Sequence, residues 1–323
     1  MAKDARVYIG VDLGATKIIA ALFDSKLKYL SSEKIKTPRE GSAQAVVKAL
    51  SECVLRTLAD AGEGAVLAAV GVAVPGPLDR AKGIVRYTPN MGFKDYHLGE
   101  ELAGRFGAPA VLENDVQAGV LGELRAGALK GMRHAVGVFI GTGIGGGIVM
   151  NGELYRGATG SAGEVGHMIL QDGGALCGCG NYGCLEALAS RTAMAKDALA
   201  LAASGKAPAL IDIAGTDIRK YRSSAFEEAI ANGDKKVKVV LDRAAYWVGV
   251  GLANLVHVLN PEAIVLGGGM ATRFGEGFRK KAEASMEAHL MPGLSGTSRL
   301  LLSELGDLAV PTGAAFAASE AGA

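Results

Sequence analysis

The chain has 323 residues, enough for two domains of ordinary size, and its 49% hydrophobic and 21% charged residues predict buried cores and exclude a disordered chain. Lys and Arg total 34 and Asp and Glu total 33, so a net charge of +1 gives no electrostatic reason to expect nucleic acid or an anionic membrane as a partner. The amino-terminal residues do not resemble a signal peptide, and no apolar run is long and uninterrupted enough for a membrane span. We therefore expect a cytoplasmic protein.

The chain opens with a predicted β-hairpin. Arg6–Gly10 is rich in Val, Tyr and Ile, the turn Asp12-Leu13-Gly14-Ala15-Thr16 follows, and Lys17–Phe23 returns as a second strand. The patterns that follow predict, in order, a helix from 42 to 61, a strand from 65 to 74, a turn at 75–77, a helix from 97 to 106, a strand from 110 to 112 and a helix from 114 to 126.

A similar arrangement starts again near residue 134. The strand from 135 to 140 leads into a glycine-rich turn and a returning strand from 148 to 150, and later a long helix (235–259), a strand (263–266) and a final helix from about 312 are predicted. Two glycine hairpins at equivalent places indicate an internal duplication, with two α/β domains facing each other across a cleft. We place the smaller domain at 1–117 plus about 305–323, with the final helix crossing back, and the larger domain at 118–304.

The turn at Gly141-x-Gly143-x-x-Gly146 has the letters of a dinucleotide fingerprint. That fingerprint needs a helix after the turn, whereas here the turn signal Asn151-Gly152 indicates that a strand returns. No Walker-type run is present. The remaining interpretations are a tight turn without a ligand, or a turn whose backbone N–H groups converge on phosphate oxygens. Two such turns in two halves favour a shared phosphate ligand.

Two acidic positions are candidate functional residues. Asp12, at the first turn, would imply Mg²⁺ in a phosphate site, although an Asx turn is the stronger interpretation of Asp12 alone. Thr16 could donate its hydroxyl to a phosphate, and Lys17 fits a solvated strand position. Glu113-Asn114-Asp115 falls where a strand ends and a helix begins, so an ionised Asp115 could accept a hydroxyl proton, with plain helix capping as the alternative.

The densest chemical signal is a cysteine cluster. Three thiols lie within eight residues, and His167 stands ten residues before the first of them: the cysteines are Cys177, Cys179 and Cys184. This pattern predicts a closed, structural Zn²⁺ site, with buried free thiols as the alternative, and clustered thiols favour a reducing compartment.

These motifs, in this order, resemble the ROK family (repressor, open reading frame, kinase), and most closely its bacterial glucokinases. The resemblance runs from Tyr8 to about Phe316 and rests on Asp12–Lys17, the Pro-Gly-Pro-Leu-Asp turn at 75–79, Glu113-Asn114-Asp115, Gly141–Gly147, Gly163-Glu164-Val165-Gly166-His167, the cysteine run ending at Glu186, and Val265–Gly269. It implies an actin/hexokinase-like (ribonuclease-H-like) two-domain fold, the cofactors ATP and Mg²⁺, and phosphorylation of a hexose 6-hydroxyl. Two positions depart from the family pattern: Ala15 replaces a second glycine, and Phe93 replaces a frequent tryptophan.

The resemblance also implies roles for individual residues. Asp115 would be the general base, and His167 would touch both the sugar and the zinc. Sugar contacts are expected from Gly76, Asn114, Asp115, Glu164, His167 and Glu186. Nucleotide and Mg²⁺ contacts are expected from Asp12, Gly14, Ala15, Thr16, Lys17, Gly141, Thr142, Gly143, Gly267, Gly268 and Gly269. The zinc ligands would be His167, Cys177, Cys179 and Cys184.

The same residues also fit other functions to different degrees. N-acetylmannosamine, N-acetylglucosamine and fructose kinases share the same candidate contacts, and polyphosphate is left open as a donor. A sugar-responsive repressor is disfavoured because the first strand begins near Arg6, which leaves no room for a preceding DNA-binding module, and a non-catalytic sugar sensor is disfavoured by the presence of Asp12 and Asp115. The resemblance suggests a homodimer or homotetramer.

Overall fold

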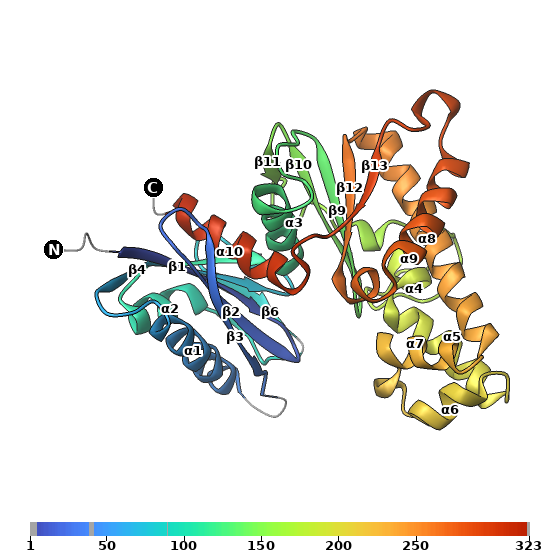
Figure 1. Ribbon diagram of the computed structural model, residues 1–323, viewed down its shortest axis with the longest axis horizontal. Helices are drawn as coiled ribbons and strands as arrows, with labels where there is room; N and C mark the ends of the chain where they lie inside the picture. Colours follow the sequence, from blue (N-terminus) through green and yellow to red (C-terminus); the bar gives the residue numbers. More distant parts are fainter. Residues whose placement is uncertain (1–4, 39–41, 89, 322–323) are drawn as a thin grey trace. The chain divides into compact units, whose positions relative to one another are not determined.

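The computed structural model describes residues 5–38, 42–88 and 90–321 and divides the chain into two compact units (Figure 1). The first unit consists of Met1–Gly131, Leu154–Ala162 and Asp307–Ala323, and the second of Met132–Glu153 and Gly163–Gly306. The carboxyl-terminal segment thus belongs with the amino-terminal unit.

A five-stranded sheet forms the centre of the first unit. The strand order is β3-β2-β1-β4-β8, where β1 pairs antiparallel with β2 and parallel with β4, and β4 pairs parallel with β8. The strands are β1 (Ala5–Leu13), β2 (Lys17–Phe23), β3 (Tyr29–Lys36), β4 (Ala65–Val74) and β8 (Ala110–Asn114). The predicted amino-terminal hairpin and the strands that become β4 and β8 are confirmed, whereas β3 was not predicted. A smaller antiparallel sheet contains β5 (Leu78–Asp79), β6 (Ile84–Tyr87) and β7 (Lys94–Tyr96).

Large apolar side chains fill one face of the first sheet. Val7, Ile9 and Val11 alternate along β1 and share one buried cluster with apolar residues of α1 (Ala43–Ala59) and α2 (Leu98–Phe106). Alternate residues of a strand point to opposite faces, so this pattern dedicates one face of β1 to the helices. Each fully buried aliphatic side chain contributes roughly 1.5–3 kcal/mol to this core.

Small residues line the other face, because α10 (Ala309–Ala321) lies directly on the sheet. A Cβ added to Gly10 would lie 1.8 Å from the carbonyl oxygen of Pro311, and one added to Gly71 would lie 1.8 Å from that of Ala314. The helix α3 (Asp115–Ala126) packs along α10 through similar contacts. This packing groups residues 118–131 with the first unit, whereas the sequence placed the domain limit at 117/118.

The second unit repeats the topology of the first. Its strand order is β11-β10-β9-β12-β13, with β9 antiparallel to β10 and parallel to β12, and β12 parallel to β13. The strands are β9 (Ala135–Ile140), β10 (Ile144–Met150), β11 (Glu153–Tyr155), β12 (Ala263–Gly267) and β13 (Arg299–Leu302). The shared order and directions confirm the predicted duplication.

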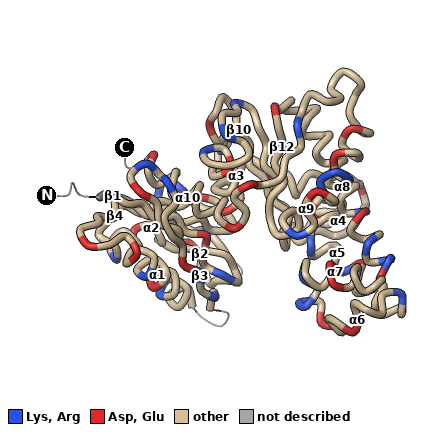
Figure 2. Tube along the Cα trace, in the orientation of Figure 1, with Lys and Arg blue, Asp and Glu red and all other residues tan. Residues whose placement is uncertain are grey.

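Helices supply most of the second unit's core. They are η1 (Val165–His167), α4 (Leu185–Ala189), α5 (Arg191–Ala203), α6 (Pro208–Ala214), α7 (Ser223–Ala231), α8 (Lys235–Leu259) and α9 (Gly268–His289). The short helices η2 (Ile218–Lys220) and η3 (Pro292–Leu294) have no buried residues, and η4 (Gly306–Leu308) spans the point where the chain returns to the first unit. Helix α8 has the predicted bounds. It is long and apolar enough to cross a membrane by length and composition alone, but Val248, Leu252 and Val256 are buried in the core. Figure 2 shows both signs of charge spread over each unit, in keeping with the balanced composition.

Candidate functional site

Two carboxylates of the first unit lie at the ends of β1 and β8, the two strands that flank β4 in its sheet. Asp12 is the penultimate residue of β1, and Asp115 follows β8 directly as the first residue of α3. Because β1, β4 and β8 are parallel, their carboxyl ends lie at one edge. Burial, and then the negative charge of Asp115, raise the pKa of Asp12 to about 7. This pair of acids favours a bound cation, which would restore the charged form of Asp12.

The predicted location of Asp12 in the turn is wrong. Asp12 lies within the β1–β2 ladder opposite Ile19, and the turn itself spans residues 14–16. The ladder extends further than the sequence indicates because Leu13 pairs with Ile18 and is fully buried. An Asx turn therefore does not explain Asp12, whereas an acid at a strand end fits a ligand-binding role.

The junction between β8 and α3 is a capped helix start. The Asn114 side-chain oxygen accepts hydrogen bonds from the backbone N–H groups of Val116 (3.0 Å) and Gln117 (3.1 Å), and Asp115 Oδ1 accepts one from Val116 at 3.0 Å. Capping thus occupies Asn114 Oδ1, as the sequence alternative allowed. The positive end of the α3 dipole favours the ionised form of Asp115. A carboxylate held ionised at a strand end can accept a proton from a bound hydroxyl.

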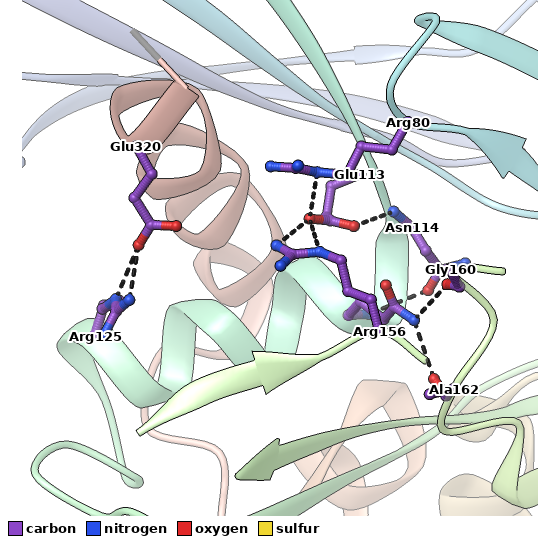
Figure 3. A network of polar contacts seen from close by, with 9 residues as sticks. Arg80, Glu113, Asn114, Arg125, Arg156, Gly160, Ala162 and Glu320 are labelled. Atoms are coloured by element: carbon purple, nitrogen blue, oxygen red, sulfur yellow. Dashed lines mark hydrogen bonds and ion pairs between the residues drawn. The ribbon is translucent and has the colours of Figure 1, made fainter. Parts of the chain in front are cut away.

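Glu113, the residue before this junction, anchors a polar network that the sequence did not predict (Figure 3). Its side chain is 2% exposed, and its Oε2 accepts hydrogen bonds from Arg80 Nε at 3.2 Å and from Arg156 Nε at 3.0 Å and Nη2 at 2.6 Å. Charge-assisted bonds of this kind are stronger than neutral ones and fix geometry. In the sequence, this network is indicated only by an acidic residue in an otherwise apolar stretch of the strand.

Gln117, on the first turn of α3, binds the segment that follows Arg156. Its Nε2 donates to the carbonyl oxygens of Gly160 and Ala162, each at 3.0 Å. The segment from 156 to 162 is therefore fixed to the end of β8 and the start of α3 at three places (Figure 3). Residues 113–117 thus combine a cap, a carboxylate and two loop anchors in five consecutive positions.

The first glycine turn is short and largely open. Ala15 and Thr16 are exposed, and the Thr37 hydroxyl donates to the Gly14 carbonyl oxygen at 2.6 Å. Lys17 was expected to be a solvated residue, but its side chain is only partly exposed and its Nζ lies 2.8 Å from Asp307 Oδ1. The ion pair corrects that expectation, because α10 begins beside this hairpin.

The backbone conformation and close packing at residue 76 both favour glycine. Its φ is +95°, which L side chains rarely adopt, and an added Cβ would lie 2.7 Å from the Tyr87 carbonyl oxygen. This packing accounts for the residue without a ligand, and its expected sugar contact stays a prediction.

The second glycine turn is held by a carboxylate. Glu186, on α4, accepts a hydrogen bond from the Ile144 backbone N–H through its Oε2 at 2.9 Å. A Cβ on Gly143 would lie 2.2 Å from that oxygen, whereas one on Gly141 would meet nothing within 4 Å. Glu186 was expected to contact a sugar, and the structure gives it this additional role of positioning the turn.

Packing within the protein explains two further glycines in this region. A Cβ on Gly166 would lie 1.9 Å from the Ile144 carbonyl oxygen, and one on Gly146 would lie 2.8 Å from the Gly163 carbonyl oxygen. The segment before His167 therefore lies directly against β10. The sequence assigned the glycine run to phosphate approach, but only part of it faces open space.

The three glycines at the end of β12 and the start of α9 also differ in the space around their Cβ positions. Gly268 has a φ of +81°, and an added Cβ would lie 2.6 Å from the Ile140 carbonyl oxygen, while Gly267 packs against the Phe139 ring. Gly269, in the first turn of α9, has nothing within 4 Å of its Cβ position. Gly269 is thus the most open of the three toward an expected nucleoside.

The predicted zinc ligands come together in the second unit. The ligand atoms of His167, Cys177, Cys179 and Cys184 all lie within 4.8 Å of one another. Cys179 Sγ is 3.7 Å from Cys184 Sγ, and Cys177 Sγ is 3.7 Å from His167 Nδ1. Zn–S bonds of about 2.3 Å in a tetrahedron would place two sulfurs about 3.8 Å apart, so the donor set fits Zn²⁺.

Two further features of this cluster are a thiol with a raised pKa and a carboxylate beside the histidine. Burial raises the pKa of the Cys177 thiol to about 12, so metal binding would have to displace its proton. His167 Nε2, the nitrogen that does not face Cys177, lies 4.0 Å from Glu164 Oε2. The two ring nitrogens thus face different partners, and the expected contacts of His167 with zinc and sugar stay predictions.

The repeated sheet topology and the strand-end residues define a duplicated two-domain α/β protein of the actin/hexokinase-like class. The profile of the ROK family matches residues 8–321. A glucokinase from Thermotoga maritima is 35% identical over 310 residues, covering 95% of each chain. The crystal structure of a ROK family glucokinase from Streptomyces griseus in complex with glucose and AMPPNP superposes with a TM-score of 0.84 at 33% identity, over 97% of this chain and 99% of that one.

A regulator is also similar to this chain. The xylose repressor of Caldicellulosiruptor bescii is 28% identical over 312 residues, which cover 96% of this chain and 77% of the repressor. The extent of the family match and the identity to curated members show that this chain belongs to the ROK family.

Proposed function

We propose that this protein is an ATP-dependent kinase that phosphorylates the 6-hydroxyl of a hexose, with glucose as the preferred sugar. The observation that carries the proposal is the placement of Asp115: a carboxylate on a helix start at the strand-end edge that also carries Asp12. The similarity to glucokinases over nearly the whole chain supports the choice of sugar.

Asp115 would act as the general base. The bond from the Val116 N–H orients its carboxylate, and the positive end of the α3 dipole favours negative charge there. It would accept the 6-hydroxyl proton as that oxygen attacks the γ-phosphorus of ATP and the bond to the β-phosphate oxygen breaks, releasing ADP. The network around Glu113 would hold the junction in place during this step.

Asp12 would hold Mg²⁺, directly or through water. With a pKa of about 7, Asp12 is only partly ionised near neutral pH, and a nearby cation would favour its charged form. Bound Mg²⁺ neutralises charge on the phosphate oxygens. The turn residues Gly14, Ala15, Thr16 and Lys17 in the first unit, and Gly141, Thr142 and Gly143 in the second, would contact the phosphates. Gly267, Gly268 and Gly269 would lie beside the nucleoside.

Sugar hydroxyls would be bound by charged and amide side chains, with the backbone of one glycine beside them. The proposed contacts are Gly76, Asn114 and Asp115 in the first unit and Glu164, His167 and Glu186 in the second. Carboxylates and imidazole accept or donate the charge-assisted bonds by which a site selects one pattern of hydroxyls over another.

Structural Zn²⁺ would be held by His167, Cys177, Cys179 and Cys184. The fit of the donor set supports this assignment. With Nδ1 on the metal, His167 Nε2 would be directed to the sugar, so the zinc would orient a sugar-binding residue. The cluster of reduced thiols favours a cytoplasmic location. We further propose a homodimer or homotetramer, without nucleic-acid or membrane partners.

A coupled assay tests the proposed activity. Purified protein is supplied with ATP, Mg²⁺ and, in separate reactions, glucose, mannose, fructose, N-acetylglucosamine or N-acetylmannosamine, and ADP release is followed. The highest kcat/KM is expected with glucose. Turnover with an N-acetyl sugar or fructose alone would replace the sugar assignment, and absence of turnover with all five would contradict the kinase proposal and favour a sugar sensor.

A further inference from the structure

An arginine lies along the second glycine turn. Arg191 is the first residue of α5; its backbone N–H donates to the Gly141 carbonyl oxygen at 3.0 Å, and its guanidinium donates to the Thr142 hydroxyl. Thr192 adds a bond from its own hydroxyl to the Thr142 carbonyl oxygen at 2.7 Å. The start of α5 therefore fixes this turn and brings a cationic group to it.

This guanidinium has a second cation, not an acid, as its charged neighbour. Burial, and then the positive charge of Arg222, lower the pKa of Arg191. Within the ranges that the structure describes, no carboxylate forms an ion pair with Arg191 or Arg222, whereas Arg219 and Arg273 are each paired with an acid at 2.8 and 2.9 Å. Two neighbouring cations without a counter-charge attract an anion.

Arg222 connects this pair to the other glycine segment. It occupies the N-cap position of α7, and the next residue, Ser223, donates its hydroxyl to Met270 Sδ at 3.1 Å. Met270 directly follows Gly269 on α9. The two arginines thus come from the segments that contact the phosphate turn and the nucleoside turn, and the Cβ positions of Gly141 and Gly269 both face open space.

We propose that Arg191, braced on the Thr142 hydroxyl and backed by Arg222, binds the phosphate chain of the phosphoryl donor. This inference rests on the proposed kinase function and adds two residues to it. A guanidinium can present two parallel N–H groups to phosphate oxygens, which a lysine cannot. The shared ligand chemistry is an oligophosphate chain, either the tail of a nucleoside triphosphate or inorganic polyphosphate.

A merely structural arginine would behave differently. If Arg191 only braces the turn, Arg191→Gln should weaken binding of AMPPNP, ADP and adenosine to a similar extent. If Arg191 binds phosphate, the effect of Arg191→Gln should grow with the number of phosphates on the ligand.

The test compares binding of AMPPNP, ADP and adenosine to the full-length protein by calorimetry. We expect Arg191→Gln to weaken AMPPNP binding about 10- to 100-fold, as loss of one or two charge-assisted bonds implies, and to leave adenosine binding and the KM for glucose unchanged. Arg222→Gln should weaken AMPPNP binding about 2- to 5-fold. Arg219→Gln, whose charge is already paired with Asp217, is the matched control and should have no effect.

Two results would overturn the inference: unchanged AMPPNP binding in Arg191→Gln, or equal loss of AMPPNP and adenosine binding. Arg222 is exposed, so its variant should fold and provides a test even if Arg191→Gln does not. Parallel assays with ATP and with inorganic polyphosphate as donor show which source the arginines serve. If the wild type binds AMPPNP through Arg191 yet phosphorylates no sugar, the proposed function fails while this inference stands.

Discussion

The two units share one topology but carry opposite chemistry at corresponding places. The strand-end residues of the first unit are acids, Asp12 and Asp115, and its glycine turn is short and exposed. The corresponding turn of the second unit is a run of glycines held by Glu186 and flanked by Arg191. Duplication thus supplied two copies of a scaffold, of which one carries carboxylates at its strand ends and the other a glycine turn beside an arginine.

The largest expected effect is a loss of turnover when the acid at position 115 of the first unit is replaced. Asp115→Asn keeps the shape and the helix start but removes the proton acceptor. We expect kcat to fall roughly 10²- to 10⁴-fold, with hexose binding retained, because general-base catalysis contributes on that order. Steady-state kinetics with calorimetric glucose binding checks this. Wild-type kcat in the variant would show that another group accepts the proton.

Packing of the second turn can be tested with two glycines. Gly166→Ala would place a Cβ 1.9 Å from the Ile144 backbone oxygen, so we expect a loss of about 3 kcal/mol in the free energy of unfolding. Gly141→Ala, where nothing lies within 4 Å, is the matched control and should change the ligand-free stability by less than about 0.5 kcal/mol. Urea unfolding measures both, and equal stabilities would contradict the packing described for this turn.

Glu113 tests how the acidic edge of the first unit is supported. Glu113→Gln leaves Arg80 and Arg156 without their carboxylate, and we expect a loss of about 2 kcal/mol, less than for a fully buried pair because both arginines reach solvent. Glu320→Gln removes a more exposed bond to Arg125 in the same unit (Figure 3) and should cost under about 1 kcal/mol. Similar thermal shifts for the two variants would mean that the network adds nothing beyond a surface ion pair.

The smallest expected effect is a pH dependence from Asp12. Its folded-state pKa of about 7 exceeds the ordinary value of 3.8, so the folded, ligand-free protein binds an extra proton between these values. Its contribution to stability is therefore fully present below pH 4 and is lost as the pH rises through 7. Asp12→Asn should raise the free energy of unfolding at pH 8 by about 1–2 kcal/mol but have a much smaller effect at pH 5. A difference that is the same at both pH values would contradict the shift.

Much of this fold could be predicted because its signals are local. The two hairpins, the strands flanking them and the bounds of α8 follow from alternation and helical periodicity within single segments. Strand β3 was missed because it is an edge strand whose side chains are mostly exposed, so its sequence, YLSSEKIK, lacks a clear apolar face. β13 was missed because it has only four residues.

In the candidate site, too, the local features could be predicted and the long-range contacts could not. The zinc ligands are close in sequence, and the structure brings them together. In contrast, the bonds of Glu113 with Arg80 and Arg156 join residues 33 and 43 positions apart, and no spacing rule connects them. The roles of Glu186 and Arg191 depend on the starts of α4 and α5 lying against the turn between β9 and β10, which one sequence without its fold does not indicate.

Product analysis tests the central claim most directly. The wild-type protein is incubated with ATP, Mg²⁺ and either glucose or 6-deoxyglucose, and the products are identified by ³¹P NMR. We predict ADP and glucose 6-phosphate with glucose, and no phosphorylated sugar with 6-deoxyglucose, which lacks the hydroxyl that Asp115 would deprotonate. Phosphate on another carbon, or no phosphorylated sugar from glucose, would contradict the proposed reaction.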